Sequence, residues 1–286
     1  MARTHAILVT HTPERLRRTI LGVAWSSARP DTLTLACDSD DPAIEAAARD
    51  ACAVGDIAMT LTMRANVGKG RSGQTRNNAV RAIAAAGADD ADALVFFDGD
   101  CVPDHAAIEL HTNALLRGQL VLGWRYELSP EQDASFDDDA LRAGRLPFTP
   151  DPEQTRAIES RHKRYQRQAT WKRFGLGKPH KPKLLSANFS CTLGTYRAIN
   201  GFDETYEGWG QEDDDFGRRV YQSGGRAVVA LRDILAYHQY HVTRAPNAWG
   251  TGPNAARLSA PCDTVCAHGL KDPLDQPEPR TIQLAP

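Results

Sequence analysis

Residues 93–100 read ALVFFDGD, a run of five apolar residues that is followed at once by Asp98, Gly99 and Asp100. Such a run is typical of a buried strand, so the acidic triplet lies where that strand emerges from its sheet. Two carboxylates one residue apart offer hard oxygen ligands to a divalent cation, and Gly99 permits close approach of a ligand. A D-x-D triplet alone is weak evidence, because the chain has four others, which start at Asp38, Asp90, Asp137 and Asp213. The prediction rests on the place of this triplet, since the other four do not follow directly on five apolar residues.

Around this run, predicted strands alternate with predicted helices. In the first helix, Thr12 is the predicted N-cap and Pro13 the first helical residue. Strands separated by helices predict an α/β fold with a Rossmann-like, mostly parallel central sheet flanked by helices. Ligands of such sheets bind beyond the carboxyl ends of the strands. The predicted strands are 5–10, 32–37, 57–63 and 93–97, and the predicted helices are 13–22, 43–53 and 75–86.

The chain has 286 residues, of which 41% are hydrophobic and 24% are charged. This composition excludes disorder as the main state, and no apolar run approaches the roughly 20 residues of a membrane helix. The pattern predicts one domain over residues 1–245, with halves at 5–125 and 184–245 around an inserted segment at 129–183. Residues 246–286 hold seven of the 17 prolines, so we expect an extended tail or lid there.

Six cysteines are few for this length and form no C-x-x-C pair, so free thiols in a reducing compartment are favoured over disulfides. Cys262 and Cys266 would supply half of a metal site, but no second half lies nearby. The apolar stretch of residues 6–9 is too short for a signal peptide. We therefore expect a cytoplasmic protein, with contact at the membrane periphery as an open alternative.

The net charge of −2 argues against a general polyanion binder, but the basic residues are unevenly distributed. Ten lysines and arginines lie between Arg156 and Lys183, against a single acid, Glu159. A solvated helix face explains this segment as well as any binding function does. The alternatives are contact with an anionic membrane surface or with an anionic acceptor, including DNA with hydroxymethylated bases, for which Trp171 and Tyr165 would add stacking.

A second acidic block lies at residues 208–220, which read GWGQEDDDFGRRV and predict the start of a helix. Asp214 and Asp215 each have an arginine four positions later, which predicts surface ion pairs. Glu212 and Asp213 lack such partners and are therefore the acids available to a substrate. Acids also stabilise a first helical turn through the helix dipole, so the block alone favours no function.

Trp209 lies between two glycines, which predicts an exposed ring suited to stacking on a sugar. Residues 236–241 read AYHQYH and continue a predicted strand. Side chains alternate along a strand, so His238 and His241 are expected to point to opposite faces, and at most one of them faces Asp98 and Asp100.

Together, these features resemble metal-dependent nucleotide-sugar glycosyltransferases of the GT-A fold. The resemblance is to the family 2 enzymes and to the galactosyltransferase group whose C-terminal motif reads GWGxED, and it covers roughly residues 5–242. Gln211 departs from that group, where glycine is common, and residues 129–183 have no evident counterpart. The resemblance rests on VTHT at 9–12, Asp38, the NVG of 66–68 with Arg76 and Asn77, the DGD, the GWGQEDDDF and the AYHQ.

The resemblance implies a hexosyl- or N-acetylhexosaminyltransferase that moves a sugar with inversion from a UDP-sugar to a hydroxyl of a glycan, glycolipid or modified nucleic acid. The donor would bind to residues 5–125 and the acceptor to residues 184–245. Asp213 would be the catalytic base. Mn²⁺ or Mg²⁺ would bind Asp98, Asp100 and His238. Acceptor binding would fall to Trp209, Gly210, Glu212 and Asn188. Donor binding would fall to Thr10, His11, Thr12, Asp38, Asn66, Gly68, Arg76, Asp98 and Gly99.

Three alternatives were weighed against this function. A sugar nucleotidyltransferase needs a glycine-rich phosphate loop after the first strand, and here HTPERLRRT holds no glycine before Gly22, which disfavours it. A glycosyltransferase that acts on modified DNA or an anionic glycan would use the segment from Arg156 to Lys183. A nucleic-acid or polyanion-binding protein with an inactive site would use the same segment.

Overall fold

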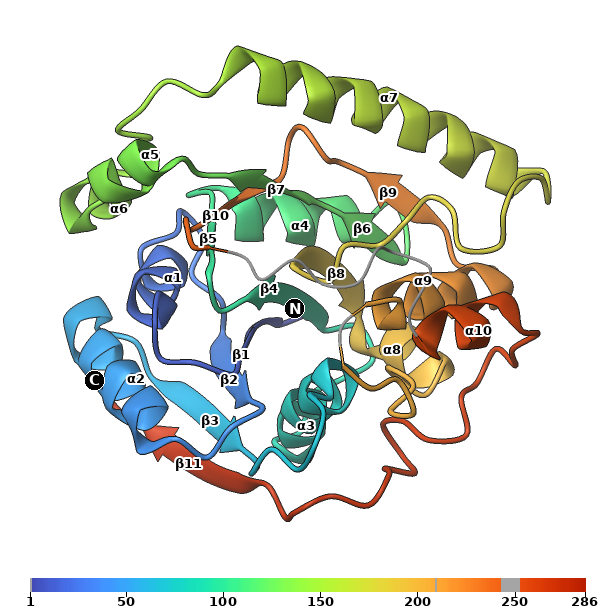
Figure 1. Ribbon diagram of the computed structural model, residues 1–286, viewed down its shortest axis with the longest axis horizontal. Coiled ribbons are helices and arrows are strands. Elements are labelled where there is room, and N and C mark those ends of the chain that lie inside the picture. Colours follow the sequence, from blue (N-terminus) through green and yellow to red (C-terminus); the bar gives the residue numbers. More distant parts are fainter. Residues whose placement is uncertain (1, 209, 243–252) are drawn as a thin grey trace.

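The computed structural model describes residues 2–208, 210–242 and 253–286, and its centre is a large mixed sheet (Figure 1). The strand order is β11-β3-β2-β1-β4-β8-β6-β9, and only β8 and β11 among these described strands run against the others. The mostly parallel α/β sheet that the sequence predicts is therefore confirmed. The strands are β1 Thr4–Thr10, β2 Thr32–Cys37, β3 Met59–Met63, β4 Ala93–Asp98, β6 Leu120–Leu122, β8 Asn188–Thr192, β9 Ala227–Val229 and β11 Arg280–Leu284.

Helices cover both faces of this sheet. Ala6 and Leu8 of β1 pack in one hydrophobic cluster with α1, α2 and α4, whereas Ile7 packs in a second cluster with α3, α8 and α9. Phe97 and Phe96 of β4 are divided between the clusters in the same way. Strands buried on both faces are apolar throughout, which explains the continuous run before the acidic triplet. The helices are α1 Leu16–Ala24, α2 Pro42–Gly55, α3 Ser72–Ala85, α4 Ala107–Leu115, α8 Leu193–Ala198, α9 Glu212–Gln222 and α10 Pro253–Ser259.

The first helix begins later than predicted. Its N-cap is Arg15, in a left-handed conformation, rather than Thr12. The hydroxyl of Thr10 donates to the Thr12 carbonyl at 2.8 Å and accepts from the Thr12 N–H at 3.2 Å. These bonds hold a turn directly after β1, and the chain becomes helical only at Leu16.

A small sheet places the AYHQ segment beside the acidic triplet. It consists of β5 Cys101–Pro103, β10 Leu235–His238 and β7 Trp124–Glu127, in that order. β10 is antiparallel to β5 with His238 opposite Cys101, and parallel to β7 with His238 opposite Glu127. Because β5 starts one residue after Asp100, this register brings His238 to the end of β4.

The inserted segment forms α5 Pro130–Ser135, α6 Asp138–Ala143 and α7 Pro152–Arg173. The basic part is helical, as predicted, and α7 lies on the outside of the molecule (Figure 1). No helix in the described ranges has both the length and the apolar character needed to span a membrane.

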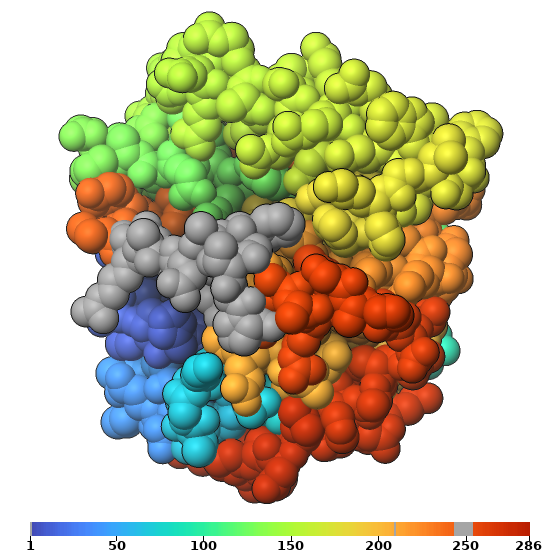
Figure 2. Space-filling model, turned by 45° about the vertical axis from the view of Figure 1, so that its right-hand side comes forward, coloured from blue at the N-terminus to red at the C-terminus, as the bar shows by residue number. Residues whose placement is uncertain are grey.

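The C-terminal residues differ from the predicted tail or lid. Within their described part, β11 adds to the large sheet as an antiparallel partner of β3, and Leu284 is buried in the core. Upstream of β11, the Leu274 N–H donates to the buried carboxylate of Glu204 at 2.9 Å. The C-terminal chain thus wraps the lower part of the molecule in Figure 2 and covers an edge that β3 would otherwise expose.

Candidate active site

The acidic triplet lies where the ends of β1 and β4 meet. The Gly99 N–H donates to the Val9 carbonyl at 2.7 Å, and a Cβ on Gly99 would lie 2.7 Å from the Cβ of Thr10. In the structure, therefore, the absence of a side chain at Gly99 allows the end of β1 to pack closely against the acidic triplet. This packing holds Asp98 and Asp100 against the end of the neighbouring strand.

Asp100 lies beside two histidines. Its Oδ2 is 3.3 Å from Nε2 of His238 and 3.4 Å from Nε2 of His241. The prediction that at most one of these histidines faces the triplet was wrong. β10 ends at His238, and the Gln239 side chain donates to the Arg15 carbonyl at 2.9 Å, so the chain no longer alternates as a strand when it reaches His241.

Hydrogen bonds fix the charges of this cluster. Burial alone would raise the pKa of Asp100, but the hydrogen bonds from His238 and Cys101 and the charges of His238 and His241 together outweigh it and lower the pKa to about 2. Burial alone would lower the pKa of His238, but bonds to Asp100 and Glu127 raise it to about 9. Glu127 accepts from Nδ1 of His238 at 2.6 Å and so orients the ring. Sequence analysis missed Glu127, because only the pairing of β7 with β10 brings it to His238.

The donor set fits a divalent cation. One ligand atom each from Asp100, His238 and His241 can lie within 4.8 Å of one another, and Asp98, Asp100 and Cys101 form a second such group. Burial raises the pKa of the Cys101 thiol well above its usual value, so the thiol remains protonated and is a poor ligand. The remaining ligands are carboxylate oxygens and imidazole nitrogens, a mixture that suits Mn²⁺ better than Mg²⁺.

Glu212 and Asp213 lie at the start of α9, and both are buried. The Ser72 hydroxyl donates to Oε1 of Glu212 at 2.9 Å, and Oε2 has no partner among the described residues. Burial, reinforced by the charge of Asp214, raises the pKa of Asp213 to about 6. Burial and the charge of Asp213 raise the pKa of Glu212. Because its pKa of about 6 is close to neutrality, the carboxylate of Asp213 is suited to accept a proton.

Arg76 of α3 connects the two acidic groups. Its Nη2 donates to Oδ1 of Asp98 at 2.8 Å, and its charge lowers the pKa values of Asp98, Glu212 and Asp213 against the effect of burial. Its Nε and Nη1 are buried and have no partner within the described parts of the chain. Two unused donors in a cluster of carboxylates indicate a place where an anionic group of a ligand would be bound.

The other acids of the block differ from the prediction of surface pairs. Asp215 binds both arginines, with Arg218 at 2.8 Å and Arg219 at 2.7 Å, and all three are buried. Asp214 instead contacts Lys183 at 3.2 Å, at the end of the inserted segment. The predicted pair of Asp215 with Arg219 therefore forms, but it is buried, and the predicted pair of Asp214 with Arg218 is replaced by Arg218 with Asp215, because both arginines also donate to backbone carbonyls in the interior. Within the described parts of the chain, Glu212 accepts from Ser72 and Asp213 from the Asp214 N–H, and neither accepts a hydrogen bond from an arginine, in line with the pattern.

The donor-side residues lie along the same edge of the sheet. Thr10 and its neighbours His11 and Thr12 follow β1, Asp38 follows β2, and residues 66–68 follow β3 with Gly68 at φ +82°. Asp38 is buried and accepts from Nη2 of Arg64 and from the Arg71 N–H. Arg64 was missed by the sequence analysis, although an arginine directly after the apolar strand 57–63 was a usable signal.

The acceptor-side residues do not form one group. Trp209 lies outside the described residues. The carbonyl of Gly210 accepts from Nδ2 of Asn254 at 2.9 Å. Asn188 is fully buried, and its amide accepts from His111 at 2.7 Å and donates to the carbonyls of Trp124 and Ile234. These contacts join β8 to its surroundings and do not support an acceptor-binding role for Asn188.

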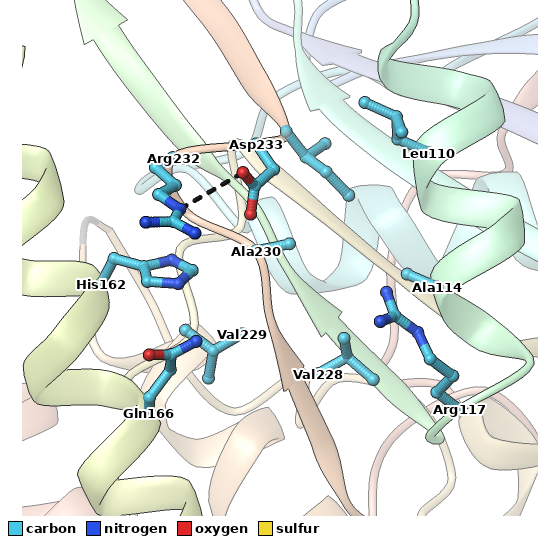
Figure 3. Close-up of a pocket in the computed structure, with 11 residues that line it drawn as sticks. Leu110, Ala114, Arg117, His162, Gln166, Val228, Val229, Ala230, Arg232 and Asp233 are labelled. Carbon is cyan, nitrogen blue, oxygen red and sulfur yellow. Dashed lines mark ion pairs between the residues drawn. The ribbon is translucent and has the colours of Figure 1, made fainter.

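A cavity of about 280 Å³ lies elsewhere, among α4, α7 and the region of β9 (Figure 3). It shares no residue with the acidic site. The carboxylate that lines this cavity, Asp233, forms an ion pair with Arg232 at 3.4 Å. His162 of α7 also lines the cavity (Figure 3). We therefore assign the chemistry to the edge of the sheet and not to this cavity.

Known structures share this architecture. GalNAc-T7, solved with UDP, GalNAc and Mn²⁺, matches with a TM-score of 0.55 and 12% identity over 90% of this chain and 47% of that chain. The 1–349 fragment of TarS from S. aureus with UDP-GlcNAc matches with a TM-score of 0.52 and 11% identity, over 84% of this chain and 60% of the fragment. Both neighbours are glycosyltransferases of the GT-A fold. The chain has the GT-A fold.

A sequence family supports the same assignment. Residues 176–247, about a quarter of the chain, match the family described as the N-terminal domain of galactosyltransferase. This range includes α9 and β10 of the GT-A fold, and hence Glu212, Asp213 and His238. No curated protein matches the chain. The chain spans 47% of GalNAc-T7 and 60% of the TarS fragment.

Proposed function

We propose that this protein is a metal-dependent glycosyltransferase that moves a sugar from a UDP-sugar to an acceptor hydroxyl with inversion. One observation carries the proposal. Arg76 links a cation-type cluster of Asp100, His238 and His241 to a buried acid with a pKa of about 6, Asp213, because it donates to Asp98 and its charge lowers the pKa of Asp213. The GT-A neighbours, two of which are described with UDP-GlcNAc or with UDP and Mn²⁺, support a nucleotide-sugar donor.

The donor would be held along the ends of β1, β2 and β3. Asp38, which accepts from Arg64, would accept hydrogen bonds from a nucleoside, and Arg76, whose Nε and Nη1 have no partner among the described residues, would bind the diphosphate. A divalent cation bound by Asp98, Asp100, His238 and His241 would neutralise negative charge on the departing diphosphate.

Asp213 would act as the base. Ionised at neutral pH, it would accept the proton of the attacking acceptor hydroxyl and so favour a single displacement with inversion. Glu212, held by Ser72, would orient that hydroxyl through its unpartnered oxygen. Arg76 would keep both carboxylates ionised when the site is desolvated by substrate.

The test is UDP release from a panel of UDP-sugars, measured with Mn²⁺ and then with EDTA. We expect metal-dependent release from one sugar, with loss of release in Asp100→Asn. Asp139→Asn is the matched control, because Asp139 is exposed on α6 and accepts no hydrogen bond from the described residues. Absence of release from every sugar, together with absence of metal-assisted UDP binding, would contradict the proposal.

A further inference from the structure

The end of α7 and the following turn form a protruding structure, here called the α7 tip and consisting of residues 171–178. The N–H of Leu176 donates to the Trp171 carbonyl and the N–H of Gly175 to the Lys172 carbonyl, both at 3.0 Å. Gly175 has φ +70°. This is the Schellman arrangement, which folds the residue after the glycine back beside the last turn of its helix. It therefore gathers Leu176 and Trp171 on one patch, with Phe174 between them in sequence.

The apolar residues of the α7 tip face solvent. In most Schellman motifs the two apolar residues bury each other, yet Trp171 is 54% exposed, Leu176 is 59% exposed and Phe174 is 74% exposed. Single exposed apolar residues are ordinary, but three within six residues at one helix end are unusual, and grouped exposed apolar side chains are typical of an interaction site. α7 lies on the outside of the fold, with its C-terminal end at the molecular surface (Figures 1 and 2).

The surroundings of the patch are basic. No aspartate or glutamate occurs from residue 160 to residue 202. Arg167, Arg173 and Lys178 are exposed, and the described residues provide no acid within salt-bridge distance of any of them. Lys172 has a different task, because its Nζ donates to the carbonyls of Lys178 and Pro179 at 2.7 and 3.3 Å and closes the turn.

Lys172 of the α7 tip lies over the ring of Tyr221 of α9, 5.6 Å from its centroid, and the segment that follows the tip is bound to the same helix. The Tyr221 hydroxyl of α9 donates to the Pro182 carbonyl at 2.8 Å, and Lys183 contacts Asp214 of the same helix. The patch is therefore anchored to the helix that carries Asp213, and a surface bound by the patch would be held at a fixed position relative to that helix.

We propose that the α7 tip docks the protein onto an anionic lipid bilayer. Trp171, Phe174 and Leu176 would enter the boundary between headgroups and acyl chains, while Arg167, Arg173 and Lys178 would bind anionic headgroups. A nucleic acid would bind the basic side chains and stack on the aromatic rings, but it has no apolar region to bury the side chain of Leu176. A bilayer would interact with all three apolar and all three basic side chains. This inference stands apart from the proposed catalytic activity.

The experiment is co-sedimentation of the full chain with vesicles of phosphatidylcholine that contain about 30% phosphatidylglycerol, compared with pure phosphatidylcholine. The wild type is expected to bind the anionic vesicles and to bind the neutral ones weakly. Changing Trp171, Phe174 and Leu176 together to Ser should lower the partition coefficient by about tenfold or more. Changing Arg167, Arg173 and Lys178 together to Glu should lower it by about a hundredfold.

Leu116→Ser is the matched control, because Leu116 is 86% exposed but lies alone at the end of α4. It should bind vesicles as the wild type does, and circular dichroism should show that every variant is folded. Equal binding by the wild type and the triple serine variant would overturn the proposal, as would equal binding to anionic and neutral vesicles. Tight binding to duplex DNA that depends on the three basic residues, without vesicle binding, would assign the α7 tip to nucleic acid instead.

Discussion

Replacing Asp213 by Asn should abolish turnover and at the same time stabilise the protein. Asn has nearly the shape of the carboxyl group and retains the oxygen that accepts from the Asp214 N–H at 2.8 Å. The substitution therefore removes a charge and a base without creating a cavity. Loss of a general base lowers the rate by about 10² or more, so turnover should fall by at least that factor.

The gain in stability follows from the pKa of Asp213, which rises from 3.8 to about 6, mainly through burial. The folded state binds this proton more tightly than the unfolded state, so the carboxyl group costs no stability below pH about 4. The cost grows as the pH rises between the two pKa values and is complete above pH about 6. At 1.36 kcal/mol per pKa unit, it amounts to about 3 kcal/mol, and Asn avoids both the cost of burial and the repulsion from Asp214.

Thermal unfolding in EDTA measures this gain without interference from bound metal. At about 2 to 4 °C per kcal/mol, Asp213→Asn should unfold about 6 to 12 °C higher than the wild type at pH 7.5, with the difference vanishing near pH 4. Asp215→Asn is the control, since it leaves Arg218 and Arg219 buried without their carboxylate and should destabilise the protein. A lower unfolding temperature for Asp213→Asn at pH 7.5, or a difference that persists at pH 4, would refute the reasoning.

Three further predictions test the rest of the site and the fold. His241→Ala, like His238→Ala, should weaken Mn²⁺ binding by about tenfold or more in calorimetry, and unchanged binding would remove that histidine from the ligand set. Gly99→Ala should cost about 1 to 3 kcal/mol in urea unfolding, because its Cβ would lie 2.7 Å from that of Thr10; a neutral effect would show that β1 can move away. Leu284→Ala should cost about 2 to 5 kcal/mol in the same assay if β11 belongs to the core, and almost nothing if the C-terminal chain is a loose tail.

The central strands could be predicted because they are buried on both faces. Their sequences are continuous apolar runs that end in polar residues, so both the sheet and its ligand edge are visible in a local pattern. The same argument placed Asp98 and Asp100 correctly at the end of β4.

Residues that depend on long-range contacts could not be predicted in this way. His241 lies beside Asp100 because β10 ends at His238. The next residue, Gln239, donates to the Arg15 carbonyl and to Thr19 of α1, which are distant in sequence. Glu127 reaches His238 only through the register of β7 and β10. The proline-rich composition of the C-terminal residues indicated an extended chain, but an extended chain can also pair with an open sheet edge, as β11 does.

The four consecutive acids of α9 show how the fold separates structural from chemical roles. Favourable interaction with the helix dipole would account for exposed acids at this position, but all four are buried, where an unneutralised carboxylate is costly. Asp215 is neutralised by two arginines and Asp214 contacts Lys183, so these two serve the structure. The charge of Arg76 acts on both Glu212 and Asp213, and that of Lys183 acts on Asp213 as well, yet burial still raises the pKa values of both acids. A purely structural helix start would gain stability by losing these two charges, and their presence beside the cation-type cluster is therefore best explained by chemistry performed there.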